Sequence, residues 1–169
     1  PNLDKFIYNA KITIFEQKMF YYKLNLIQKN FLWYGSRLSK KKHLINPQWL
    51  RNIKSKKYPL WRLNILFSDI KYNNINFIKN GGWHFTNIKS AEEINYKMKN
   101  YLHHLEFEES GLEIDDLKKI ISEKKLIYDH NADKKSKKWN SSINLDQEEE
   151  ELLPSYIIEN KKKFKDWLD

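Results

Sequence analysis

The sequence predicts an α/β chain, and three observations lead to this class. Short segments rich in aromatic and β-branched residues recur in the first half, as in β-strands. Segments with capping residues and helical apolar spacing occupy much of the second half. Hydrophobic residues make up 40% of the 169 residues and aromatic residues 15%, which is enough to form a core. The length suits one domain, or part of a larger one, and the composition argues against a wholly disordered chain.

Residues 1–88 are expected to be mainly strands and loops. The aromatic and β-branched residues of 11–24 predict one long strand or two short ones. Residues 31–34 predict a further short strand, which Gly35 ends. Strands therefore begin early in the chain, which argues against a purely helical bundle.

A short helix and two more strands are expected within the same part. Asn46 and Pro47 are typical of a helix start, with Asn as N-cap and Pro at the first helical position, so 48–53 should be helical. Alternating apolar and polar residues in 74–78 predict a strand. The Asn-Gly-Gly sequence at 80–82 predicts a turn that leads into a short strand over 83–86.

Residues 89–130 are expected to be helical. Ser90 is an N-cap, and Glu93 three residues later completes a capping box. The helix that starts here is expected to reach residue 105, because its apolar residues recur at helical spacing. Those residues are Ile94, Met98, Tyr101, Leu102 and Leu105. A second helix is predicted over 115–125.

The remainder is expected to be a polar loop over 131–147 and a helical tail over 148–169. An acidic run at 148–151 precedes Pro154. The apolar residues of the tail are Tyr156, Ile157, Phe164, Trp167 and Leu168. Their spacing implies that the tail docks on the rest of the domain.

Absent residues and motifs exclude several classes of protein. The chain has no cysteine, which excludes disulfides, a thiol nucleophile and a thiolate zinc site. It contains no P-loop, no dinucleotide-binding glycine motif, no serine-hydrolase elbow and no HExxH zinc motif. No stretch reaches the ~18 apolar residues that a membrane-spanning helix needs.

The charge is positive, with 31 basic and 22 acidic residues and a formal net charge of +9. The chain has 28 Lys, 19 Ile and 18 Asn but only 3 Arg and 3 Ala. Codons of the abundant residues are rich in A and T, so an AT-rich gene accounts for much of the lysine. Because selection for a phosphate partner favours Arg, the charge is weak support for nucleic-acid binding.

The sequence Gly81-Gly82-Trp83-His84 is the most specific candidate site. Two glycines allow a close backbone approach to a ligand, and Trp beside His combines a stacking face with a titratable nitrogen. The structural alternative is a hairpin turn followed by a core Trp and a hydrogen-bonded His. Composition alone favours that alternative, since pockets are few in any protein.

Carboxylates and other histidines supply further candidates. Glu92 lies beside the capping-box residue Glu93 and could act as a general base, although helix-dipole stabilisation also explains it. His103, His104 and Glu106 suggest a metal site, but only His103 and Glu106 have helical spacing, so a solvated face is favoured. Other single candidates are Arg51, Arg62 and His130, of which the arginines could bind phosphate or carboxylate.

Five ordered blocks of this sequence resemble a known family of enzymes. They are Phe15-Glu16-Gln17-Lys18-Met19-Phe20-Tyr21-Tyr22, Gly81-Gly82-Trp83-His84-Phe85, Ala91-Glu92-Glu93-Ile94 with Lys97, His104-Leu105-Glu106-Phe107, and Leu153-Pro154-Ser155-Tyr156 before Asn160. Together they resemble glycosyltransferase family 17, the family of the β-1,4-mannosyl-glycoprotein β-1,4-N-acetylglucosaminyltransferase. The likeness is closest to bacterial and viral-type members and covers nearly the whole chain.

The resemblance implies a partial GT-A-like fold with a helical C-terminal tail. The donor would be UDP-N-acetylglucosamine, and the acceptor a mannose-containing glycan. A divalent cation, Mn²⁺ or Mg²⁺, would be held mainly by a DxD-type motif. Because Pro1-Asn2-Leu3 resembles the residues that follow this motif, the chain is expected to be the C-terminal portion of the domain, without most of the nucleotide-binding sheet. Such a portion need not be active by itself.

The same resemblance implies roles for individual residues in an inverting transfer. Glu92 would be the catalytic base, with Glu106 as the second candidate. Gly81, Gly82 and Trp83 would bind substrate, and His84 would contact the metal or the diphosphate. Arg62 is a further substrate-binding candidate, from its residue type rather than from the resemblance.

Location and partners follow only in outline. A bacterial or viral-type member would be cytoplasmic or peripheral to a membrane, with an upstream anchor still possible, whereas eukaryotic relatives would lie in the Golgi membrane. No specific nucleic acid is expected, and the oligomeric state stays open. The alternative functions are a basic, aromatic-rich module that binds nucleic acid and a non-catalytic scaffold.

Overall fold

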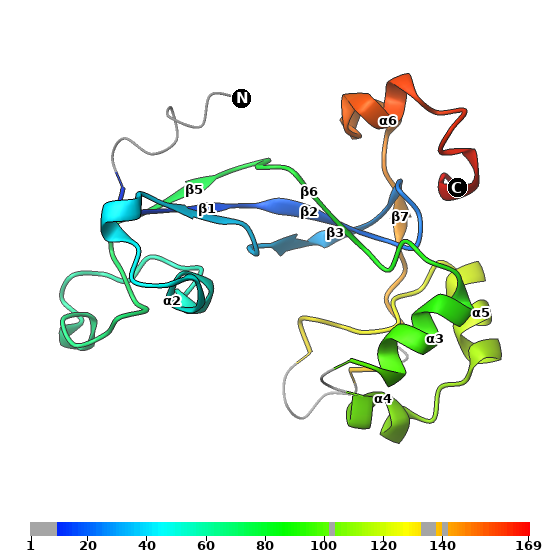
Figure 1. Cartoon of the computed structure of the whole chain (residues 1–169), viewed down its shortest axis with the longest axis horizontal. Coiled ribbons are helices and arrows are strands. Elements are labelled where there is room, and N and C mark those ends of the chain that lie inside the picture. Colours follow the sequence, from blue (N-terminus) through cyan, green and yellow to red (C-terminus); the bar gives the residue numbers. More distant parts are fainter. Residues whose placement is uncertain (1–9, 102–103, 133–137, 140–141) are drawn as a thin grey trace. The chain divides into compact units, whose positions relative to one another are not determined.

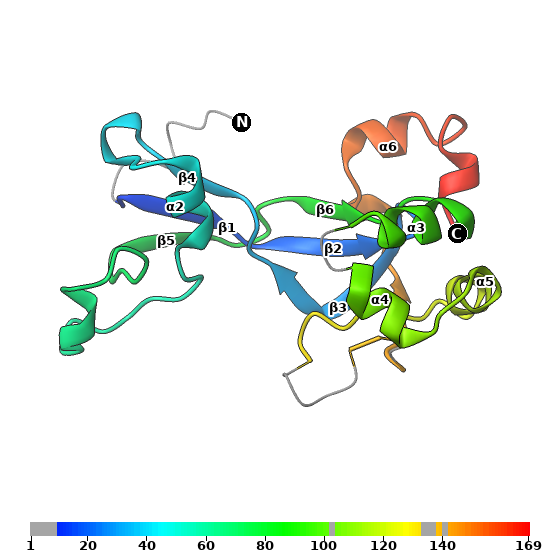
Figure 2. The same cartoon turned by 60° about the horizontal axis from the view of Figure 1, so that its bottom comes forward.

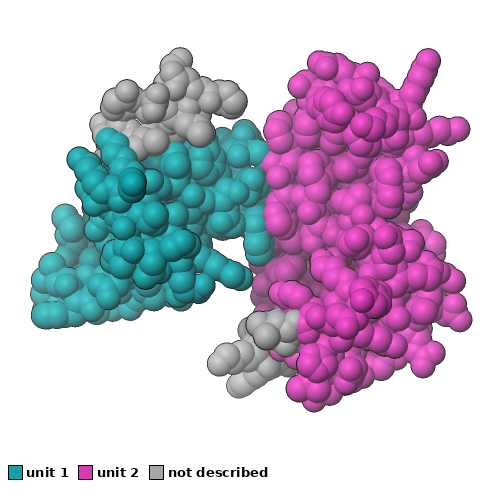
Figure 3. All heavy atoms as spheres, in the orientation of Figure 1, with its two compact units in different colours: residues 1–18, 32–82 teal, residues 19–31, 83–169 magenta. Residues whose placement is uncertain are grey.

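A computed structural model describes residues 10–101, 104–132, 138–139 and 142–169. The chain divides into two compact units, coloured teal and magenta in Figure 3. Unit 1 consists of residues 1–18 and 32–82, and unit 2 of residues 19–31 and 83–169. The described residues form two small mixed sheets and several helices, so the predicted mixed α/β class is confirmed.

Unit 1 is built on a three-stranded sheet in the order β4-β1-β5. The central strand β1 (Ile12–Phe15) is parallel to β5 (Ile75–Ile78) and antiparallel to β4 (Arg37–Ser39). The first predicted segment therefore forms two short strands, β1 and then β2 (Gln17–Tyr21), as one of the two alternatives proposed. The strand β4 was not predicted, because its three residues carry no apolar alternation.

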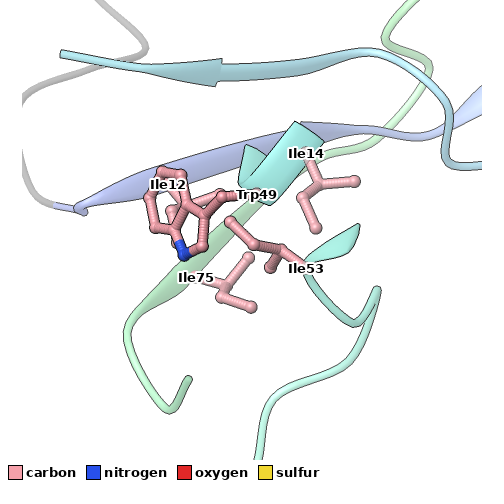
Figure 4. Packing of buried hydrophobic residues seen from close by; sticks show 5 residues of the cluster. All are labelled: Ile12, Ile14, Trp49, Ile53 and Ile75. Atoms are coloured by element: carbon pink, nitrogen blue, oxygen red, sulfur yellow. The ribbon is translucent and has the colours of Figure 1, made fainter. Parts of the chain in front are cut away.

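A helix covers the core of unit 1. Helix α2 (Pro47–Asn52) begins as predicted, since the Asn46 side chain accepts a hydrogen bond of 2.7 Å from the backbone N–H of Trp49. Figure 4 shows the buried cluster that this helix closes. Its members are Ile12, Ile14, Trp49, Ile53 and Ile75. Two 3₁₀ turns, Lys41–His43 and Leu63–Ile65, flank α2 in sequence.

Unit 2 contains most of a four-stranded sheet in the order β6-β2-β3-β7. Strand β3 (Leu26–Trp33) begins earlier than predicted, because Leu26 and Ile27 are buried and extend it towards β2. Strand β6 (Trp83–Thr86) is confirmed. The edge strand β7 (Asp146–Gln147) lies in the predicted polar loop and pairs with β3 antiparallel. Residues 133–137 and 140–141 of that predicted loop lie outside the described residues.

Three helices pack together in unit 2 (Figures 1 and 2). Helix α3 (Ala91–Lys99) has the predicted capping box, with Ser90 and Glu93 bonded to each other's backbone N–H. Helix α4 spans His104–Ser110 and helix α5 spans Ile114–Ser122, which confirms a second predicted helix. The side chains of Ile94, Met98 and Leu117 are buried in this group.

The predicted continuous helix from residue 90 to 105 is wrong. Helix α3 ends at Lys99, where the Asn100 side chain donates a 2.8 Å hydrogen bond to the Tyr96 carbonyl and caps the helix end. Tyr101 is consequently 51% exposed and Leu105 63% exposed, and Phe107 of α4 is the buried residue instead. Leu102 lies outside the described residues.

The predicted helical tail is present as short pieces and packs on the rest of unit 2. Two 3₁₀ turns, Glu150–Leu152 and Lys165–Trp167, flank helix α6 (Ser155–Glu159). Leu153 and Ile157 pack in a buried cluster with Phe20, Leu24 and Ile27, and Phe164 and Leu168 pack against it. Tyr156 and Trp167 were predicted for this buried face but are 56% and 37% exposed.

Candidate functional site

The predicted site residues fall in both units and are described unit by unit. Gly81, Gly82 and Arg62 belong to unit 1. Trp83, His84, Glu92 and Glu106 belong to unit 2. Four of the predicted site residues thus share unit 2, where they could act together chemically.

Both glycines have structural contacts in unit 1. The Gly81 N–H donates a 2.8 Å hydrogen bond to the Glu16 carbonyl, and the Gly82 carbonyl accepts one of 3.1 Å from the Lys18 N–H. A Cβ at Gly81 would lie 2.9 Å from the Ile78 carbonyl oxygen, and Gly82 has a φ of +128°. The turn thus needs glycine for its backbone path, whatever else it binds.

Arg62 is exposed at the start of the 3₁₀ turn over 63–65. Its guanidinium carbon lies 5.9 Å from the centre of the Tyr58 ring. The side chains of Lys56 and Lys71 also lie over that ring, at 5.5 and 5.8 Å. Arg62 is therefore one of three cations gathered on a single aromatic ring.

Trp83 is half-buried on strand β6. Its indole N–H donates a 2.8 Å hydrogen bond to the Leu152 carbonyl, which fixes the ring. Because 42% of the residue stays exposed, part of this fixed ring is available for stacking.

His84 follows on the same strand and lies in a cationic environment. Its pKa is lowered by burial and by the charge of Lys97. Lys97, whose own pKa is lowered by burial, donates a 2.6 Å hydrogen bond to the Asn87 side chain. The pKa of His130 is lowered by burial, and His84 also contributes to that lowering. The His130 imidazole stacks on the Phe31 ring and contacts the Tyr128 ring edge-on, which covers part of the imidazole although the residue as a whole is exposed.

Unit 2 is expected to lose stability as the pH falls below about 6.5, the ordinary pKa of histidine. The unfolded chain binds protons there, whereas folded His84 and His130 bind them only at lower pH, so acid favours unfolding. Urea unfolding of unit 2 between pH 7 and pH 5 measures this slope. The double variant His84→Gln/His130→Gln should flatten it, and His43→Gln in unit 1 should not; an unchanged slope in the double variant contradicts the assignment.

Glu92 lies at the N-terminus of α3 with an exposed carboxylate. The Lys118 ammonium of α5 is 3.0 Å from Oε1. The pKa of Glu92 is lowered, first by the hydrogen bond from its own backbone N–H and then by Lys118 and Ser90. Glu92 is therefore ionised at neutral pH, as a carboxylate that accepts a proton must be.

An open groove of about 630 Å³ runs along α3. We call it the α3 groove; its lining residues are Lys89, Glu92, Glu93, Tyr96, Lys97, Asn100 and Tyr101. Tyr96 is 72% exposed and Tyr101 51% exposed, so two aromatic rings share the groove with the Glu92 carboxylate. Aromatic faces with a few polar groups are typical of small-molecule sites.

Sequence reasoning missed the two tyrosines of this groove. Tyr101 was assigned to the buried stripe of a longer helix, and Tyr96 was not singled out. For Tyr101 the signal was Asn100, whose capping tendency ends the helix before that ring. Tyr96 lies within α3, off the face that buries Ile94 and Met98. Lys97, noted only as part of the resemblance, is the residue that connects the groove electrostatically with His84.

The second predicted base and its neighbours lie elsewhere. Glu106 is in the first turn of α4 and is not among the residues that line the α3 groove. The His104 ring nitrogen Nδ1 lies 3.1 Å from the Tyr101 carbonyl oxygen, so His104 stabilises the break between α3 and α4. His103 lies outside the described residues.

The predicted metal role of His84 stays a prediction. Among the described residues, no three His, Asp or Glu side chains lie close enough together to hold a metal ion. No described helix is long and apolar enough to cross a bilayer.

The chain matches no protein-family model, no curated protein and no solved structure.

Proposed function

We propose that the protein is an inverting glycosyltransferase with a partial GT-A-like fold, which transfers N-acetylglucosamine from UDP-N-acetylglucosamine to a mannose-containing glycan. The resemblance to glycosyltransferase family 17 names the donor and acceptor. The observation that carries the proposal is the α3 groove, in which an ionised carboxylate and two exposed tyrosine rings lie together.

The groove is proposed to bind the acceptor glycan. Tyr96 in α3 and Tyr101 just beyond its end both line the groove and offer two apolar faces to successive sugar rings. Asn100 and Lys97 supply hydrogen-bond donors between them. Trp83, with its indole held by Leu152, would add a further stacking face on β6.

Glu92 is proposed to remove the proton from the attacking sugar hydroxyl. The hydroxyl oxygen then forms a bond to C1 of N-acetylglucosamine while the bond from C1 to the diphosphate oxygen breaks. The leaving UDP takes the electron pair, and the proton stays on the Glu92 carboxylate. A cation is implied by the resemblance, but the described residues form no site for it, so no step here depends on one.

Loss of the two tyrosine rings is expected to weaken glycan binding about tenfold or more, since each stacking contact contributes about 0.5–1.5 kcal/mol. The test compares Tyr96→Ala/Tyr101→Ala with the unchanged protein by ligand-observed NMR with a mannose-terminated oligosaccharide. The Phe versions of both substitutions keep the rings and should keep binding.

Tyr156→Ala is the matched control, because Tyr156 is equally exposed in unit 2 but lies outside the groove. If the double alanine variant binds the glycan as well as the unchanged protein, the groove is not the acceptor site. If the complete gene product binds the glycan but transfers no sugar, the protein is a glycan-binding module.

A further inference from the structure

The net positive charge of the chain comes entirely from unit 1. Unit 1 has 14 basic and 3 acidic residues, whereas unit 2 has 17 basic and 19 acidic residues. An AT-rich gene explains the many lysines of both units, but it does not explain why acidic residues are almost absent from one of them. From Gln17 to Ala91 the only acidic residue is Asp69. The basic character of unit 1 therefore needs another cause.

The same unit displays large apolar side chains to solvent. We call residues 60–67 the apolar loop; its exposed residues are Leu60 at 77%, Trp61 at 79%, Leu63 at 72%, Leu66 at 75% and Phe67 at 90%. Single exposed apolar residues are common, but five large ones within eight positions are not. The loop lies between α2 and β5, away from the sheet of unit 1 in both views (Figures 1 and 2).

The apolar loop is an ordered structure and not an extended segment. Its backbone forms consecutive turns, in which the Arg62 N–H donates a hydrogen bond to the Pro59 carbonyl and the Ile65 N–H donates one to the Arg62 carbonyl. Its base is fixed to the core of unit 1, because the Asp69 carbonyl accepts hydrogen bonds of 2.7 Å from the Trp49 indole and 2.8 Å from the Tyr72 hydroxyl. The backbone polar groups are thus largely satisfied while the apolar side chains point outward.

Cations surround the base of this loop. The charged groups of Lys56, Arg62 and Lys71 all lie within 6 Å of the centre of the Tyr58 ring. Within the part of the chain that the structure describes, none of the three forms an ion pair with a carboxylate. Exposed apolar side chains beside three cations that gather on the Tyr58 ring are complementary to a bilayer with anionic headgroups over an apolar interior.

We infer that the apolar loop inserts into the interfacial region of anionic membranes and anchors unit 1 there. Trp61 and Phe67 would lie at headgroup level and the leucines would reach the acyl chains, while Lys56, Arg62 and Lys71 contact lipid phosphates. Single-stranded nucleic acid is less suited to the loop, because base stacking requires aromatic faces and three of the five exposed residues are leucines.

Flotation with vesicles of phosphatidylcholine alone, and with ~30% phosphatidylglycerol added, tests the inference. Binding is expected only to the anionic vesicles and should weaken as salt is added. Each of the variants Lys56→Gln and Lys71→Gln, which removes one cation, should bind about fivefold more weakly. The variant Trp61→Ser/Phe67→Ser should lose binding about tenfold or more. Since both residues are exposed, this variant should fold, which circular dichroism verifies. Tyr96→Ser/Tyr101→Ser in unit 2 is the matched control and should bind normally.

Quenching by brominated lipids tests insertion itself. The part of tryptophan quenching that disappears in Trp61→Phe belongs to Trp61, and this variant keeps an apolar ring and should still bind. Three results overturn the inference. The first is that neutral vesicles bind the protein, and anionic vesicles bind Trp61→Ser/Phe67→Ser, as strongly as anionic vesicles bind the unchanged protein. The second is oligonucleotide binding without vesicle binding, and the third is a concentration-dependent dimer that the serine variant abolishes. Glycan binding is measured separately with the tyrosine variants, so failure here leaves the proposed function intact.

Discussion

Replacement of Glu92 by glutamine is expected to lower N-acetylglucosamine transfer by about 10²–10⁴-fold, the usual contribution of a general base. Glutamine keeps the size of the side chain but cannot accept the proton of the sugar hydroxyl. The Ser90–Glu93 capping box, which starts α3, is left intact. The rate is measured in the complete gene product with radiolabelled UDP-N-acetylglucosamine and a mannose-terminated acceptor.

Two controls separate the loss of the base from other effects. Lys118→Gln removes the ion pair at 3.0 Å but keeps the carboxylate. Because Lys118 contributes to the lowered pKa of Glu92, this variant should move the acidic limb of the pH–rate profile to higher pH while activity at neutral pH persists. Glu109→Gln changes an exposed carboxylate of α4 and should have no effect. Unchanged transfer in folded Glu92→Gln would refute the assignment of the base.

Replacement of Phe20 by alanine is expected to lower the free energy of unfolding of unit 2 by about 3–5 kcal/mol. Phe20 is fully buried where the tail packs on the sheet, with Leu153 and Ile157 from the tail in the same cluster. Its ring centre is 5.1 Å from that of Phe85. Since domains are stable by only about 5–15 kcal/mol, the loss should also release the tail to proteolysis.

The measurement is urea unfolding followed by circular dichroism, with limited proteolysis of residues 148–169. Phe67→Ala is a matched control, because Phe67 is 90% exposed and its loss leaves no cavity. Phe20→Leu keeps most of the volume and should lose less than about 1.5 kcal/mol. If Phe20→Ala unfolds at the same urea concentration as the unchanged protein, the tail does not depend on this cluster.

Local signals in the sequence predicted local structure well. Asn46 with Pro47 and Ser90 with Glu93 act within a single helical turn, and both start the helices expected of them. The break after Lys99 was missed because apolar periodicity outweighed the capping tendency of Asn100. Strands β4 and β7 were missed because short edge strands depend on partners distant in sequence rather than on their own pattern.

The candidate site was predictable only in part. Glu92 was identified, but its partner Lys118 comes from another helix, and no spacing rule connects them. Tyr96 on the exposed face of α3 and Tyr101 beyond its end were recognised only once the structure placed both beside that carboxylate. The net charge of +9 was read as a single property of the chain, whereas the structure assigns it to one unit and so changes what it implies.

The division into units determines when each unit can fold during synthesis of the chain. Neither unit is a continuous segment, because residues 19–31 of unit 2 interrupt unit 1. Strand β1 emerges from the ribosome early but cannot pair with β5 until Ile75–Ile78 has followed. Strands β2 and β3 likewise cannot pair with their outer neighbours β6 and β7 until those later strands have been synthesised. A break anywhere between residues 19 and 82 therefore divides both units, and they must mature together.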